Sequence, residues 1–124
     1  MLILKFYDPS FSVELLKPQI TFSQGQLNLA EVGSTVKFEC QWPGANVSSQ
    51  ELQSVVCKLY FREEGTDTKV HLSNATVAVV NQSFHIELTG TTESNTGDYF
   101  CELTRQKSSG MSDELFLGVY SKYL

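Results

Sequence analysis

Alternation of apolar and polar residues is the dominant pattern in this sequence. In segment 36–40, valine, phenylalanine and cysteine alternate with lysine and glutamate, and similar alternation returns in segment 83–88. A period of two residues is that of a β-strand with one buried face and one solvent-exposed face. The pattern therefore predicts an all-β fold built from half-buried strands.

Turn-forming residues divide this pattern into separate strands. In chain order, strands are expected at residues 13–22 with a second half at 27–30, and then at 36–40, 55–62, 69–74, 76–80, 83–88, 99–103 and 114–120. Segment 41–50 is rich in turn formers and is expected to be an exposed loop, and segment 105–113 a second loop. Residues 12–121 would form one domain, with 1–11 as an N-terminal extension or inter-domain segment and 122–124 as a C-terminal tail.

Composition narrows the classes of function. A chain of 124 residues suffices for one two-layer domain with its own core. The formal net charge of −5 argues against nucleic acid or an anionic membrane as the main partner, because both attract basic surfaces. His71 and His85 lack the spacing of a zinc site, so neither a metal nor a cofactor is expected. The sequence has no nucleophile elbow, phosphate loop or paired carboxylates at a recognisable turn, so a binding module is expected and not an enzyme.

The segment from Asn95 to Cys101 resembles the corner before the second core cysteine in domains of the immunoglobulin superfamily. The family's pattern is Asp-x-Gly-x-Tyr-x-Cys. The chain matches it at Gly97, Tyr99 and Cys101 and has Asn95 in place of the aspartate. The resemblance covers residues 18–120 and implies an immunoglobulin-like two-sheet Greek-key sandwich of constant-like or intermediate type, as in Fc-receptor-like or adhesion receptor ectodomains. It also implies that the Tyr99 hydroxyl bonds back to the backbone at this corner.

The same resemblance implies a disulfide and a position for Leu59, and strand parity and position suggest roles for Cys57 and Trp42. Cys40 and Cys101 would form the disulfide between the two sheets, and Leu59 stands where the family usually places a tryptophan against that bridge. Cys57 would then share the inward face with Leu59 as a buried free thiol; the alternative is an outward thiol that cross-links to another chain. Trp42 is expected to pack at the end of the sandwich, with a ligand-anchoring role as the alternative.

Three acceptor sequons for N-glycosylation begin at Asn46, Asn74 and Asn81. Together with the expected disulfide, they predict an extracellular location, either as the ectodomain of a cell-surface membrane protein or as a secreted protein. No apolar run approaches the ~18 residues of a membrane span. Lys5 interrupts the apolar start, so the chain is expected to be an excised ectodomain.

Strand parity predicts a binding face on one sheet of the sandwich. If Cys101 points inward, its two neighbours in the strand point outward, and the same reasoning applies to segments 55–62 and 114–120. The partner-binding residues predicted in this way are Lys58, Tyr60, Arg62, Phe100, Glu102 and Phe116, and Arg105 and Lys107 of the following loop are expected to add contacts.

The expected partner is a protein ligand on a cell surface or in the extracellular space, recognised by aromatic anchors within a charged rim. Two alternatives remain. In a structural spacer domain of a multidomain receptor, the aromatic side chains would lie in the core or under a neighbouring domain. In a homodimer, the same face would bind a second copy of the chain.

Overall fold

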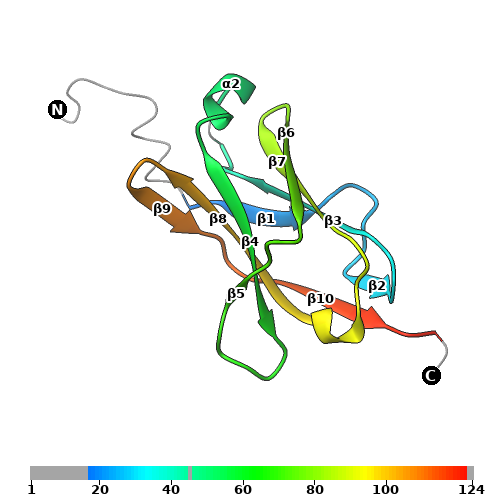
Figure 1. Ribbon diagram of the computed structural model, residues 1–124. Helices are drawn as coiled ribbons and strands as arrows, with labels where there is room; N and C mark the ends of the chain where they lie inside the picture. The colour runs from blue at the N-terminus through cyan, green and yellow to red at the C-terminus, as the bar shows by residue number, and fades with distance from the viewer. Residues whose placement is uncertain (1–16, 45, 123–124) are drawn as a thin grey trace, which may run out of the picture.

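The computed structural model describes residues 17–44 and 46–122, which form a sandwich of two β-sheets (Figure 1). This confirms the predicted all-β, two-sheet architecture. The elements are β1 (Gln19–Phe22), β2 (Leu29–Glu31), β3 (Val36–Gln41), α2 (Ser49–Leu52), β4 (Val56–Glu63), β5 (Val70–His71), β6 (Thr76–Val80), β7 (Ser83–Leu88), the 3-10 helix η1 (Glu93–Asn95), β8 (Gly97–Arg105), β9 (Ser108–Met111) and β10 (Leu115–Tyr120).

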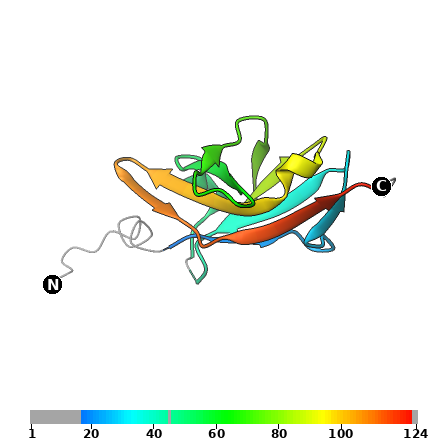
Figure 2. The same ribbon diagram turned by 90° about the horizontal axis from the view of Figure 1, so that it is seen from below.

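The two sheets differ in size and in strand direction. One has four strands in the order β1-β3-β7-β6, and all of its neighbouring strands are antiparallel. The other has six strands, in the order β2-β10-β8-β4-β5 with β9 paired to β8, and β2 runs parallel to β10. The β8–β9 hairpin projects at one end of the molecule, and the end of β10 lies at the other (Figure 2).

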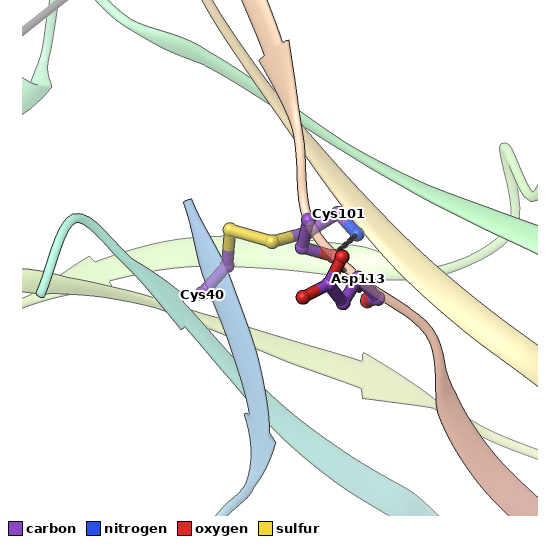
Figure 3. Close-up of a disulfide and its surroundings, with 4 residues drawn as sticks. Cys40, Cys101 and Asp113 are labelled. Atoms are coloured by element: carbon purple, nitrogen blue, oxygen red, sulfur yellow. Dashed lines mark hydrogen bonds between the residues drawn. A yellow bond between two sulfur atoms is a disulfide. The ribbon is translucent and has the colours of Figure 1, made fainter. Parts of the chain in front are cut away.

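The predicted disulfide joins the centres of the two sheets. Cys40 on β3 is bonded to Cys101 on β8, and the two residues are 61 positions apart in the chain (Figure 3). Closing a loop of this length stabilises the fold by about 4 kcal/mol in the chain-entropy model. Leu59 lies directly opposite Cys101 in the β4–β8 ladder and is 1% exposed, so leucine does pack at the disulfide, as expected. Trp42 is buried in the same core cluster, as predicted.

The predicted tyrosine corner is also present. The Tyr99 hydroxyl donates a hydrogen bond to the Asn95 carbonyl oxygen at 2.5 Å, and its ring packs between Phe38 and Phe61 with centroid distances of 5.1 and 5.0 Å. Burial raises the pKa of this hydroxyl. Because the ring touches a strand of each sheet, the corner ties the start of β8 to both layers.

Strand boundaries are confirmed in the middle of the chain and corrected elsewhere. β6 and β7 span the predicted segments 76–80 and 83–88. The strand expected at 69–74 is present but much shorter, because only Val70 and His71 pair with β4 and the chain then turns at 73–74. Of the strand expected at 13–22, β1 occupies Gln19–Phe22, and residues 13–16 lie outside the described residues.

The loop expected at 41–50 contains ordered structure. Gln41 belongs to β3, and a short helix, α2, begins at Ser49. The Ser48 hydroxyl accepts from the Glu51 backbone N–H, and the Glu51 carboxylate accepts from the Ser48 backbone N–H, which together form a capping box. These hydrogen bonds lower the pKa of Glu51. Leu52 is buried, so the helix closes one end of the core.

The loop expected at 105–113 is mostly a β-hairpin. β8 continues to Arg105, and Ser108–Met111 pairs back onto it. Glu102 of β8 lies opposite Met111 of β9, and Tyr99 of β8 lies opposite Leu115 of β10. Between these two pairs, β8 has two residues and the segment from β9 to β10 has three. The extra residue makes a β-bulge. Figure 3 shows Asp113, at this bulge, beside the Cys101 backbone.

Candidate binding face

The outer face of the six-stranded sheet carries the side chains that strand parity assigned to it. On β4, Leu59 and Phe61 are buried in the core, and Lys58, Tyr60 and Arg62, which alternate with them, point to the outer face. On β10, Leu117 and Val119 are buried, whereas Phe116 and Tyr120 are 42% and 47% exposed. The predicted orientation of both strands is therefore confirmed.

Phe100 is the exception to the predicted exposure. It lies opposite Tyr60 on the outer face and does not join the core cluster, yet it is only 3% exposed. The Arg62 guanidinium carbon lies 5.1 Å from the centroid of its ring, and the Lys69 Nζ lies 4.5 Å from it. These cation–π contacts cover the ring. The prediction of Phe100 as an exposed anchor is therefore wrong, because parity gives the face of a residue but not what covers it.

Polar side chains on β4 and β8 bind one another across this half of the face. Arg62 Nη2 donates to Asp98 Oδ2 at 2.8 Å, and this hydrogen bond raises the pKa of Arg62. Tyr60 donates its hydroxyl proton to Glu102 Oε1 at 3.4 Å. Burial, followed by the charge of Glu102, raises the pKa of Tyr60.

Glu102 is the centre of this network. Its Oε2 accepts from the Ser109 hydroxyl on β9 at 3.0 Å, and Lys58 lies directly opposite it on β4. The four predicted residues Lys58, Tyr60, Arg62 and Glu102 are thus brought together, each half-buried. Arg62 is paired with Asp98, and Lys58 lies opposite Glu102, so opposite charges adjoin one another on this part of the face.

An apolar strip lies beside the polar network, over β10 and β2. It consists of Leu29, Phe116 and Tyr120, of which Leu29 is 58% exposed. Leu29 lies opposite Gly118, and a Cβ built on that glycine would lie 3.0 Å from Leu29 Cδ2 and 3.7 Å from Phe116 Cε2. The side chains of Leu29 and Phe116 therefore both lie next to Gly118, and Tyr120 follows two residues further along the same face of β10.

Sequence reasoning missed the contribution of Leu29. Segment 27–30 is expected to extend the first strand, but β2 instead pairs in parallel with β10. No local pattern signals a parallel pairing between segments about ninety positions apart. The two basic residues expected to extend the face lie at the β8–β9 hairpin: Arg105 ends β8 and is half-buried, and Lys107 is exposed in the turn.

Cys57 points to the core side of β4 and packs against the core cluster, as expected of an inward free thiol. It is only partly buried, because it lines a groove of about 490 Å³ between β4 and β6. Burial raises the pKa of its thiol to about 12. Val77, Ala78 and Val79 of β6 form the opposite wall of this groove.

The three sequon asparagines are exposed and lie on the side of the four-stranded sheet. Asn74 precedes β6 and Asn81 follows it. Asn46 lies beside Asn81, because its Oδ1 accepts from Gln82 Nε2 at 3.3 Å. Asn46 therefore lies next to the β6–β7 hairpin.

Within residues 17–44 and 46–122, no group of three or more His, Cys, Asp or Glu side chains is placed to hold a metal ion. No helix in this part of the chain is long and apolar enough to span a membrane. Comparisons with protein-family models and with curated proteins find no significant match to the sequence.

Proposed function

We propose that this chain is an extracellular protein-recognition module of immunoglobulin type, which binds a protein partner through the outer face of its six-stranded sheet. The observation that carries the proposal is the exposed apolar strip of Leu29, Phe116 and Tyr120 beside a self-matched polar network. Interface centres are rich in aromatic side chains and poor in unpaired charge.

Rigidity also supports this proposal. The strip stands on β10, which pairs with β8, and β8 carries both the disulfide cysteine and the corner tyrosine. A preorganised surface loses little conformational entropy on binding. The three sequons lie at the other sheet, so glycans attached there would leave this face accessible.

The proposal is tested by comparing the glycosylated, oxidised domain with two variants. Leu29→Glu/Phe116→Glu places two charges in the apolar strip. Val80→Glu is the matched control, because Val80 is 42% exposed like Phe116 but lies on the other sheet. All three proteins are first shown to have the same thermal stability and are then compared for binding to a panel of leukocyte and epithelial cell surfaces.

The strip variant should lose at least about tenfold in binding, since hot-spot residues contribute more than about 1 kcal/mol each. The control should bind like the wild type. Equal binding of all three proteins would contradict the choice of face. Binding by none of them, together with a monomeric mass, would favour a structural spacer, whereas a dimeric wild type and a monomeric strip variant would favour a homodimer through the strip.

A further inference from the structure

β6 is an edge strand of the four-stranded sheet. Within the described residues it pairs only with β7, so one side of its backbone has no strand partner. Its sequence is Thr-Val-Ala-Val-Val, with no charge and no proline, and Val77 and Val80 are 41% and 42% exposed. Such a strand is a ready template for pairing with another chain.

The end strands β2 and β5 of the six-stranded sheet do not share this hazard. β2 has three residues and contains Glu31, and β5 has two residues. Short length and charge are the usual protections of an edge strand. β1, the opposite edge of the four-stranded sheet, has four residues and is preceded by Lys17 and Pro18.

β6 is also self-complementary. If two copies of β6 pair in an antiparallel register centred on Ala78, Val77 of each copy lies opposite Val79 of the other, and Thr76 lies opposite Val80. Such pairs of β-branched side chains stabilise a sheet, and no like charges meet. The arrangement has two-fold symmetry and closes with two copies.

Two sequons bracket this strand. Asn74-Ala75-Thr76 ends on the first residue of β6, and Asn81 is the first residue after its last. Asn81 occupies the hairpin tip with φ of +56°, a conformation that asparagine tolerates better than most residues. Both asparagines are exposed. An N-linked glycan is bulky, and a paired strand would have to approach to about 4.8 Å.

We propose that N-glycans on Asn74 and Asn81 protect the edge of β6, and that β6 of a second copy is the partner they exclude. The glycans would then prevent another chain from pairing with β6, as charge and short length prevent it at β2 and β5. Loss of both glycans converts the domain into a dimer joined through β6. Because β6 belongs to the four-stranded sheet, a test of its glycans does not depend on the proposed binding face on the six-stranded sheet.

The test uses the full chain from glycosylating cells. Asn74→Gln/Asn81→Gly removes both sequons, and glycine keeps the positive φ of the hairpin without strain. Asn46→Gln removes a glycan site that does not adjoin β6. A third protein adds Ala78→Lys to the double variant, because Ala78 lies opposite half-buried His85 and is exposed at the edge. Intact mass gives glycan occupancy, thermal unfolding checks folding, and light scattering gives the mass in solution at about 1–100 μM.

The wild type and Asn46→Gln should be monomers, the double variant should approach twice the monomer mass with rising concentration, and Ala78→Lys should restore the monomer. The proposal is overturned if Asn74 and Asn81 carry no glycan in the wild type, or if the folded double variant stays a monomer. It is also overturned if the association persists with Ala78→Lys, because the contact would then not be the β6 edge.

Discussion

Gly97 is the residue whose replacement tests the packing of β8 against β4 most sharply. It lies opposite Glu63 at the end of the β4–β8 ladder. A Cβ at this position would lie 2.3 Å from the Arg62 carbonyl oxygen and 2.9 Å from Phe61 Cε1. Since ordinary contacts begin near 3.4 Å, Gly97→Ala requires the two backbones to separate by about 1 Å in a tightly packed sheet.

The expected cost follows from what this separation disturbs. Overpacking of a core costs roughly 1–3 kcal/mol. The displacement would also weaken the adjacent Arg62–Asp98 hydrogen bond and the ladder beside it, for about 1 kcal/mol more. We therefore expect Gly97→Ala to lower the free energy of unfolding by about 3 kcal/mol, a large part of the roughly 5–15 kcal/mol of a typical domain.

Gly118→Ala is the matched control, because Gly118 is also a buried glycine in a strand of the same sheet. The one close contact of its Cβ would be with the end of the Leu29 side chain at 3.0 Å, which is exposed and can move, whereas the next atoms lie at 3.7 Å or beyond. This variant should stay within about 1 kcal/mol of the wild type. Urea unfolding of the oxidised proteins, followed by Trp42 fluorescence, measures both values. Similar stabilities for the two variants would refute the reasoning.

Three further results are expected. Tyr99→Phe removes the hydrogen bond to the Asn95 carbonyl oxygen and should cost about 1–2 kcal/mol in urea unfolding; an unchanged midpoint would mean that the corner hydroxyl adds no stability. Replacing Cys40 and Cys101 together by alanine should lower the free energy of unfolding by about 4 kcal/mol in the same assay, and a loss below about 1 kcal/mol would contradict the chain-entropy estimate. The pKa of Cys57 rises from 9.0 to about 12 on folding, so the unfolded thiol loses its proton first, and the stability that Cys57 contributes is lost as pH rises from 9 to 12. Cys57→Ala should therefore show a shallower fall in stability over that range, and parallel pH profiles would contradict the burial of the thiol.

Long-range pairing defined by a motif could be predicted from the sequence. The spacing of Gly97, Tyr99 and Cys101 located the corner, and alternation located Cys40 on its partner strand. The corner and the disulfide could be predicted because each depends on particular side chains at fixed spacings. β6 and β7 could also be predicted, because the two strands of a hairpin are adjacent in the sequence.

The exposure of residues on the outer face of the six-stranded sheet could not be predicted, because it depends on side chains from distant segments that pack onto that face. Strand parity correctly predicted that Phe100 points to the outer face. It could not predict that Lys69, from the segment expected to form a separate strand, packs over the Phe100 ring. Leu29 joined the strip through a parallel pairing with no local signal. The β8–β9 hairpin was not predicted, because the serine and glycine residues of β9 give no alternation of apolar and polar residues. By contrast, the capping box of α2 was present in the sequence as Ser48 and Glu51 and could have revealed that helix.

Photo-crosslinking tests most directly whether the outer face of the six-stranded sheet is the recognition surface. A benzophenone amino acid is placed at position 116 in one protein and at position 80 in another, two sites of equal exposure on different sheets. Each glycosylated protein is irradiated on cells that bind the wild type. We expect a discrete adduct with a cell-surface protein from position 116 and none from position 80. An adduct from position 80 alone would contradict the proposed face.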